Sequence, residues 1–287
     1  MRLVLVHGRG QGEKEAGQIE QSWRDALGRG LQAAGLPPLA ADLDVRLPFY
    51  GKVLDEMAVR PAAPGEVVAR GPGDVSDPFE GMLVLELAER AGISDEEIAA
   101  ELGQERVARG PENWEWVHAA GRVISRRVPW LGERLLPVMT RDVHAYLSRL
   151  DVTEAVNDLV AADLDAGPAV VVGHSLGSIV AYWVLTERAP GVDVRLFVTV
   201  GSPLGVDVVK KYLPRPLGRP SGVAHWLNAA DERDPVALYS RLDRDIFPAE
   251  IENVNDVHNP SDNPHGIAGY LGDRVVAQRL SAALTQA

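Results

Sequence analysis

Apolar runs rich in β-branched residues recur along this chain of 287 residues, separated mostly by segments with a helical pattern. The four clearest runs are Leu3–Val6, Ala169–Val172, Val194–Val200 and Val223–Asn228. Runs that are apolar at consecutive positions are typical of strands buried on both faces, as in parallel sheets covered by helices. A fifth run, around Asp42–Leu47, alternates more and is expected nearer an edge of the sheet.

Helical patterns fill most of the gaps between these runs. Apolar residues at four-residue spacing from Ile19 to Leu31 predict a helix that Gly35 can end. Another helix is expected to start at Asp151, with Glu154 as the partner in a variant of the capping box. Strands that alternate with helices predict right-handed βαβ units, and therefore an α/β fold with a mostly parallel central sheet. The later helices are expected at about residues 152–164, 176–187 and 273–284.

The alternation stops at about residues 51–141. Proline- and glycine-rich stretches come first there, and several helical patterns follow. One helix is expected to start with the capping box Ser94-Asp-Glu-Glu97, and another with Pro111 in its first turn. We interpret residues 1–287 as a single α/β domain that carries a helical insertion at about 51–141.

Composition excludes several classes of function. The chain has 41 acidic and 29 basic side chains, a formal net charge of −12, so nucleic acid is not expected as its main partner. Arg122, Arg126 and Arg127 are the one hint of a local basic patch. The absence of cysteine excludes disulfides, thiolate metal sites and a cysteine nucleophile. With no transmembrane segment and no signal peptide in the sequence, we expect a cytoplasmic protein.

The strongest chemical signal is Gly173-His174-Ser175-Leu176-Gly177, between a predicted strand and a predicted helix. A sharp strand-to-helix turn exposes the Ser175 hydroxyl as a nucleophile, and it requires glycine at both ends because side chains would clash there. The Leu176 amide, at the start of the helix, can bind a developing oxyanion. The alternative is a glycine-rich turn without catalytic function.

Four parts of the chain resemble the α/β hydrolases of the lipase and esterase group: Val6–Gly10, Gly173–Gly177, Gly201–Leu204, and the acid and histidine segments described below. The resemblance implies a three-layer α/β sandwich with a serine, an acid and a histidine in that chain order, each on a loop at the carboxyl end of a strand. It also implies a second oxyanion donor in the first loop, at Arg9 or else Gly8. That loop lacks the Gly-Lys-Ser/Thr of a phosphate-binding P-loop.

The acid is expected in the loop after the strand at 223–228, where Asp231 and Asp234 are both available. The family places its acid just before a short step that ends in valine or isoleucine, which Asp234 matches better. Pro235 also favours an extended backbone at Asp234, which suits a loop that projects a carboxylate. We take Asp234 as the acid and Asp231 as the alternative.

The base is expected near the C-terminus, where His258 and His265 both qualify by position. His265 stands between Pro and Gly and is soon followed by Tyr-Leu, as in the family, so we prefer it to His258. In the implied mechanism neutral His265 takes the proton of Ser175, and Asp234 holds the ring and stabilises the imidazolium.

The remaining histidines predict no metal site. His174 and His7 are interpreted as packing or backbone-bonding residues beside the nucleophile. No other histidine has a partner at metal-ligand spacing, so we expect neither a metal nor a cofactor. These other histidines are His118, His144 and His225.

We therefore expect the hydrolysis of a carboxylic ester, with the insertion acting as a lid. The segment Gly201–Leu204 resembles lipases and favours a lipid-like or aliphatic substrate. Thioesters and amides use the same triad. Two alternatives remain: a non-catalytic module of the same fold that binds a ligand or partner, and a lipase effector controlled by a partner that the sequence does not identify.

Overall fold

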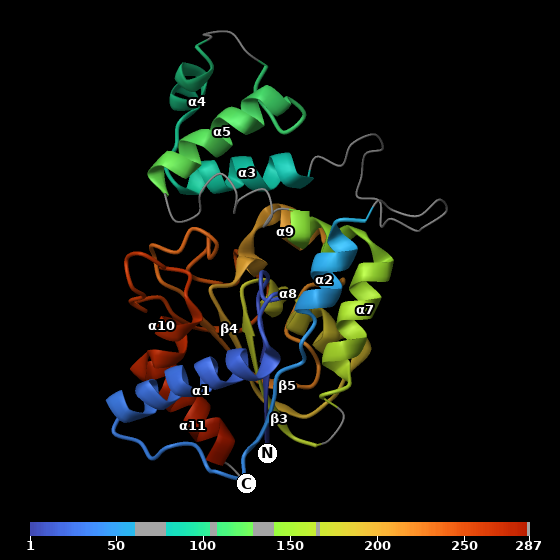
Figure 1. Ribbon diagram of the computed structural model, residues 1–287, viewed down its shortest axis with the longest axis vertical. Coiled ribbons are helices and arrows are strands. Elements are labelled where there is room, and N and C mark those ends of the chain that lie inside the picture. The colour runs from blue at the N-terminus through green and yellow to red at the C-terminus, as the bar shows by residue number, and fades with distance from the viewer. Residues whose placement is uncertain (61–78, 104–107, 129–140, 165–166, 286–287) are drawn as a thin grey trace. The chain divides into compact units, whose positions relative to one another are not determined.

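The five predicted strands and one further strand form a six-stranded sheet in which all neighbouring strands are parallel (Figure 1). The computed structural model describes residues 1–60, 79–103, 108–128, 141–164 and 167–285. The strand order is β2-β1-β3-β4-β5-β6. The strands are β1 (Arg2–Val6), β2 (Asp44–Arg46), β3 (Ala169–His174), β4 (Val194–Val200), β5 (Val223–Ala229) and β6 (Glu252–Val254).

All five predicted runs are strands, and the fifth, β2, lies at an edge as expected. The α/β architecture with a parallel sheet is thereby confirmed. The strand β6 was not predicted. It has three residues, of which only Val254 is apolar, so this edge strand carries too little hydrophobic pattern to be recognised.

Helices connect the strands from β1 to β5, and a loop without a helix joins β5 to β6. Those of the α/β part are α1 (Ala16–Ala33), α2 (Gly51–Ala58), α7 (Leu150–Ala161), α8 (Leu176–Trp183), α10 (Ile267–Gly272) and α11 (Arg274–Thr285), with a π-helical turn at Val184–Arg188 and a 3₁₀ turn at Pro203–Gly205. The others are α3 (Phe79–Arg90), α4 (Asp95–Leu102), α5 (Trp114–Arg127) and α9 (Asp207–Tyr212).

The chain divides into two compact units. The first consists of residues 1–56, 154–205 and 213–287 and contains the whole sheet. The second consists of residues 57–153 and 206–212, and the expected insertion at 51–141 overlaps most of it. The proline- and glycine-rich stretches that open the insertion lie mostly outside the described residues.

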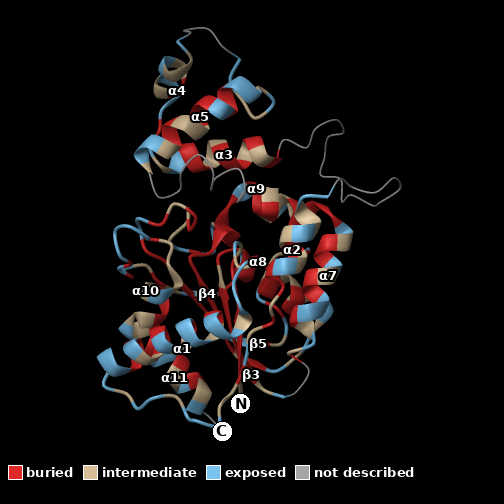
Figure 2. Cartoon of the chain, viewed as in Figure 1, coloured by how far each residue is buried: buried red, intermediate tan, exposed pale blue. Residues whose placement is uncertain are grey.

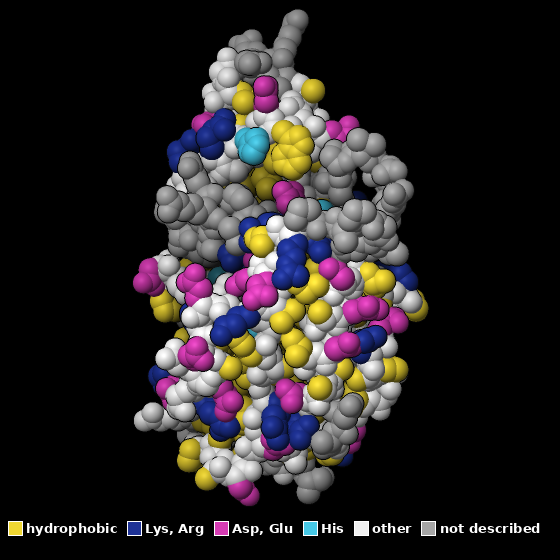
Figure 3. All heavy atoms as spheres, turned by 45° about the vertical axis from the view of Figure 1, so that its right-hand side comes forward, with side chains coloured by type: hydrophobic (Ala, Val, Ile, Leu, Met, Phe, Trp, Pro, Cys, Tyr) yellow, Lys and Arg dark blue, Asp and Glu magenta, His cyan; other side chains and the backbone are white. Residues whose placement is uncertain are grey.

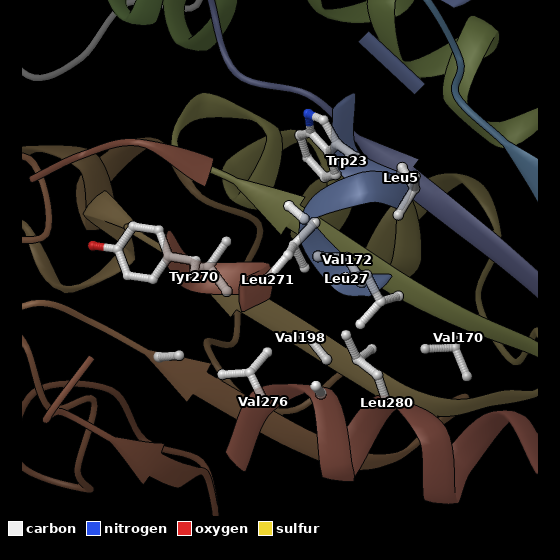
Figure 4. Packing of buried hydrophobic residues seen from close by; sticks show 14 of the residues in the cluster. Leu5, Trp23, Leu27, Val170, Val172, Val198, Tyr270, Leu271, Val276 and Leu280 are labelled. Carbon is white, nitrogen blue, oxygen red and sulfur yellow. The ribbon is translucent and has the colours of Figure 1, made fainter. Parts of the chain in front are cut away.

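The core of the first unit lies on both faces of the sheet, whose strands are buried along most of their length (Figure 2). Leu5 and Val172 belong to one cluster with residues of α1, α10 and α11, and Figure 4 shows Trp23 of α1 beside Leu271 of α10, with Leu280 of α11 on the opposite side of the cluster. The alternate strand residues are equally buried on the other face, against which α8 packs. Burial on both faces explains why these strands read as continuous apolar runs.

Helix α1 begins at Ala16 and reads as predicted. Ile19, Trp23 and Leu31 form part of its buried stripe. Gly35 ends the helix with a φ of 68°, a left-handed conformation that glycine adopts at low cost. The Leu36 N–H then donates to Leu31 O at 2.9 Å.

Two predicted helix starts are wrong. Helix α7 begins at Leu150 and follows residues 141–148, which are also helical, so Asp151 is no N-cap and its carboxylate instead accepts bonds from Arg149. Helix α5 is capped by Asn113, whose side chain accepts from Glu115 N at 3.1 Å, and Pro111 lies before it. Local start signals were overruled in the first case because the preceding helix already satisfies the backbone.

The other capping prediction in this part of the chain is confirmed. The Glu97 N–H donates to Ser94 Oγ at 3.3 Å, and the Ser94 N–H donates to Glu97 Oε2 at 2.9 Å, which together form the capping box of α4. Within the second unit α5 packs on both α3 and α4, and Trp116 is fully buried there.

The three arginines that suggested a basic patch are paired. Arg122 and Arg126 both contact Glu101, at 2.7 and 2.6 Å, and Arg127 contacts Glu97. On the face drawn in Figure 3, lysine and arginine side chains are likewise interspersed with aspartate and glutamate. Among the described helices, none is both long and apolar enough to cross a membrane.

Candidate active site

The turn between β3 and α8 consists of Ser175 alone. With φ 56° and ψ −129°, Ser175 is the only non-glycine residue with positive φ in the described part of the chain. Such backbone costs about 1–3 kcal/mol and persists only where its surroundings hold it. Here the Ser175 N–H donates to Val200 O at 3.1 Å, while Ser178 donates to Ser175 O from its N–H at 2.9 Å and from its Oγ at 2.6 Å.

The glycines on either side of Ser175 are sterically required, as predicted. A Cβ on Gly173 would lie 2.7 Å from Ser178 Cα, and one on Gly177 would lie 2.1 Å from Val6 O and 2.5 Å from His7 O. Real Cβ atoms do not approach backbone atoms so closely. The first turn of α8 therefore packs directly against the end of β1, which brings the loop after β1 close to Ser175.

The loops after β1 and β3 meet at the topological switch point of the sheet. From β1 the chain adds β2 on one side, and from β3 it adds β4 on the other. In open parallel sheets ligands bind outside the carboxyl ends of the strands at this point. Ser175, Leu176, Gly8 and Arg9 all lie there.

The structure pairs two of the predicted residues directly: His265 Nδ1 donates to Asp234 Oδ2 at 2.7 Å. The same oxygen accepts the Tyr270 hydroxyl at 2.6 Å, and Asp234 Oδ1 accepts the N–H groups of Val236 at 2.9 Å and Ala237 at 3.4 Å. Burial raises the pKa of the Asp234 carboxyl, but the charge and hydrogen bonds around it outweigh burial and hold the pKa below its usual value. Asp234 is therefore a buried carboxylate at neutral pH.

The two alternative residues have other partners. Asp231 accepts from the Arg233 guanidinium at 2.7 Å and from Asn259 N at 2.7 Å, which braces the loop. His258 is exposed, and its Nδ1 donates to Asp256 O at 2.7 Å. The structure thus brings together Asp234 and His265, the preferred members of the two pairs.

The His265–Asp234 pair lies beside the residue that follows β4. A Cβ on Gly201 would be 3.0 Å from Asp234 Oδ2 and 3.1 Å from His265 Nδ1. The residue before Gly201, Val200, accepts the Ser175 N–H. The consecutive residues Val200 and Gly201 therefore contact the serine turn and the acid–base pair, respectively.

His174 makes a second link between these segments. Its Nε2 donates to the backbone carbonyl of His265 at 2.9 Å, and its ring packs near the rings of Trp23 and Tyr270. Burial is the main cause that lowers the pKa of His174 to about 3, so the ring is neutral at pH 7. A ring with so low a pKa binds a proton too weakly to be an effective base near neutral pH, which agrees with the prediction from the sequence.

The loop after β1 touches Ser175 and is rigidly held. A Cβ on Gly8 would lie 2.9 Å from Ser175 Cβ. His7 Nδ1 donates to Gly8 O at 2.6 Å, and His7 Nε2 accepts the Tyr50 N–H at 3.3 Å, an arrangement that requires the neutral ring. Burial lowers the pKa of His7 to about 4. In a trans peptide the C=O and the N–H point in opposite directions. Because the Gly8 C=O points to the His7 ring, the N–H of Arg9 in the same peptide points away from that ring.

Three structural roles at the site were missed from the sequence. Tyr270 donates to Asp234, the Tyr50 hydroxyl donates to His7 O, and the buried hydroxyls of Ser178 and Ser202 lie 2.7 Å apart beneath Ser175. Only Tyr270 carried a signal, since it follows His265 by five residues in a segment that resembles the family. The other contacts join segments far apart in the chain and leave no local pattern.

Among the described residues, no group of three or more His, Cys, Asp or Glu side chains could hold a metal ion. Comparison with known proteins brings no relative: no family model, no curated protein and no solved structure matches the chain. The function is therefore argued from the geometry of the site.

Proposed function

We propose that the chain is a serine hydrolase of the α/β-hydrolase fold, close to the lipases and esterases, which cleaves a carboxylic ester through an acyl-enzyme. One observation carries the proposal: Ser175 occupies a strained strand-to-helix turn whose neighbours contact the His265–Asp234 pair. Strain of this kind is kept where it serves a function, and a nucleophile needs such exposure beside a base.

In the proposed reaction Ser175 Oγ attacks the ester carbonyl and His265 Nε2 takes its proton. The hydrogen bond from Nδ1 to Asp234 holds the ring in the tautomer that leaves Nε2 free of a proton. The bond from carbon to the leaving alcohol then breaks, and the imidazolium protonates that alcohol. Water attacks the acyl-enzyme by the same route, which releases the acid and regenerates Ser175.

The negative oxygen of the tetrahedral intermediate requires two N–H donors. As the first residue of α8, Leu176 has an N–H without an acceptor inside its own helix. The Arg9 N–H, oriented by the His7–Gly8 hydrogen bond, is the candidate for the second donor, with Gly8 as its alternative. Loss of one such donor typically costs about 3 kcal/mol of transition-state stabilisation.

The proposal extends to the substrate and to the second unit. The resemblance of Gly201–Leu204 to lipases favours an aliphatic or lipid-like ester, and residues 57–153, which the chain enters after α2, are the candidate for a lid. A panel of esters with short to long acyl chains tests the substrate class. A steep rise in kcat/KM with acyl-chain length is expected. A kcat/KM that does not change with chain length would refute the proposal of a lipid-like substrate.

Labelling with a fluorophosphonate tests the chemistry itself. The probe should modify Ser175, as identified by peptide mass spectrometry, and Ser175→Ala should lose labelling and reduce turnover by about 10⁴ or more. His265→Ala should also abolish labelling, while the matched control His258→Ala should keep it, because His258 is exposed and faces Asp256.

Two results would refute the proposal. A binding module would leave Ser175 unmodified at every probe concentration that labels a known serine esterase. Turnover unchanged in Ser175→Ala would exclude the serine mechanism altogether.

A further inference from the structure

Tyr270 lies in α10, five residues after His265, at the boundary between the apolar core and the acid–base pair. Its ring belongs to the cluster that contains Leu271 and Val276, and it is fully buried. Figure 4 shows the ring at the edge of this cluster with the hydroxyl oxygen pointing away from the apolar side chains. The ring is thus fixed by packing, and the position of its hydroxyl follows from the core.

The direction of the hydrogen bonds at this hydroxyl is determined by its neighbours. The backbone N–H of Asp231 lies 3.3 Å from the hydroxyl oxygen, and an N–H can only donate. The oxygen therefore accepts there, and its single hydrogen is directed to Asp234 Oδ2 at 2.6 Å. Burial and the nearby Asp234 raise the pKa of Tyr270 far above neutrality, so the hydroxyl remains a donor.

Asp234 Oδ2 consequently has two donors that compete for it, Tyr270 and His265 Nδ1. The other carboxylate oxygen, Oδ1, accepts the backbone N–H groups of Val236 and Ala237, which fix the orientation of the carboxylate. A hydrogen bond to a carboxylate disperses its negative charge. The Tyr270 bond therefore reduces the electrostatic stabilisation that Asp234 gives to the His265 imidazolium.

The geometry assigns Tyr270 as a positioning residue of the proposed hydrolase, which holds the Asp234 carboxylate in line with His265 and weakens its pull on the imidazolium. This inference rests on the proposed function for its catalytic meaning. Its physical core, the coupling of the Tyr270 hydroxyl to the His265 ring through Asp234, does not require turnover.

Few other charged or titratable groups are placed against this pair by the described contacts. His174 packs against His265 with a ring centroid distance of 4.7 Å and is neutral at pH 7. The Asp231 carboxylate is paired with Arg233, and His7 is a buried neutral ring in the neighbouring loop. The change expected on removal of the Tyr270 hydroxyl is therefore transmitted mainly through Asp234.

The test is Tyr270→Phe, which keeps the ring and removes the donor. NMR titration of the ¹³C-labelled His265 ring should show its midpoint moved upward by about 0.5–1 pH unit, because Asp234 Oδ2 then loses the donor that competes with the imidazolium. The acid limb of kcat/KM should move by the same amount, with little change in KM. Tyr182→Phe is the matched control, since the hydroxyl of this equally buried tyrosine contacts Gly218 instead.

A second measurement keeps the Tyr270 hydroxyl and predicts a shift of the His265 midpoint in the opposite direction. Site-specific 3-fluorotyrosine in place of Tyr270 is a stronger donor and should move the same midpoint downward. In an Asp234→Asn background Tyr270→Phe should have no effect on it. A midpoint that does not move with either change, or that moves equally without Asp234, would overturn the role of Tyr270.

Failure of this inference can be separated from failure of the proposed function. The NMR titration reads the His265 ring whether or not Ser175 reacts, while fluorophosphonate labelling reads Ser175 whether or not Tyr270 matters. If Ser175 is labelled but the His265 midpoint does not shift, only the role proposed for Tyr270 is refuted. If the midpoint shifts but Ser175 is not labelled, only the proposed hydrolase function is refuted.

Discussion

His174 and His265 are directly linked: Nε2 of His174 donates to the backbone carbonyl of His265 at 2.9 Å, and the two ring centroids lie 4.7 Å apart. His174 immediately precedes the candidate nucleophile, so the turn that carries Ser175 also holds the loop that carries the candidate base. Residues 91 positions apart in the chain are thereby kept in fixed relation.

The link between His174 and His265 predicts a difference between two substitutions. His174→Gln retains an N–H donor at a comparable distance and should keep turnover within several-fold. His174→Leu removes the donor and should lower kcat by about 10–100-fold, because small displacements of a base are costly. Steady-state kinetics at pH 8 check this. Equal activity of the two variants would show that the hydrogen bond does not position the loop.

The buried histidines predict that the fold loses stability in mild acid. The pKa values of His7 and His174 are lowered from 6.5 to about 4 and about 3, mainly by burial. Between these values and 6.5 the unfolded chain binds protons that the folded chain does not, so stability falls as the pH drops below about 6.5. For His7 alone the free energy of unfolding should fall by about 2 kcal/mol between pH 7 and pH 5.

Urea unfolding as a function of pH measures this loss. His174→Gln should make the fall from pH 7 to pH 5 smaller, since it removes one of the two groups that take up a proton on unfolding. A pH dependence identical to that of the wild-type protein would mean that His174 is protonated in the folded state.

Two glycines of α1 predict opposite effects of the same substitution. A Cβ on Gly28 meets nothing within 4 Å, so Gly28→Ala should stabilise the protein by about 0.5–1 kcal/mol through its helix propensity. A Cβ on Gly30 would lie 2.5 Å from Leu271 O and 2.9 Å from Ala277 Cβ. Gly30→Ala should therefore disturb the packing of α1 on α10 and α11 and destabilise the protein by about 1–3 kcal/mol. Denaturant unfolding distinguishes the two, and a loss in both would contradict the close approach at Gly30.

The two aspartates of the loop after β5 should separate function from stability. Asp234→Asn keeps the shape of the side chain but disturbs the tautomer of His265, so kcat should fall by about 10⁴ while the fold remains. Asp231→Asn weakens the bonds to Arg233 and Asn259, so it should cost about 1–3 kcal/mol of stability with turnover within about 10-fold. The reverse outcome would make Asp231 the acid.

The central strands of the sheet could be predicted from local pattern, because burial on both faces leaves an unbroken apolar run in each of them, whereas their order in the sheet came only from the structure. Strand β6 was not predicted, because a strand of three residues at the edge of a sheet needs no continuous apolar run. The start of α7 escaped for a different reason: the helical residues before it satisfy the backbone that Asp151 would otherwise cap.

The chemistry of the site divides in the same way. The need for Gly173 can be predicted from the sequence, because a side chain there would clash with Ser178 in the same turn, whereas Gly177 avoids Val6 and His7, which only the fold brings close to it. The choice of Asp234 over Asp231 and of His265 over His258 required contacts 31 residues apart, which loop conformation decides and composition does not. Tyr270 and His174 act on this pair only because parallel strands bring the ends of distant segments to one edge of the sheet.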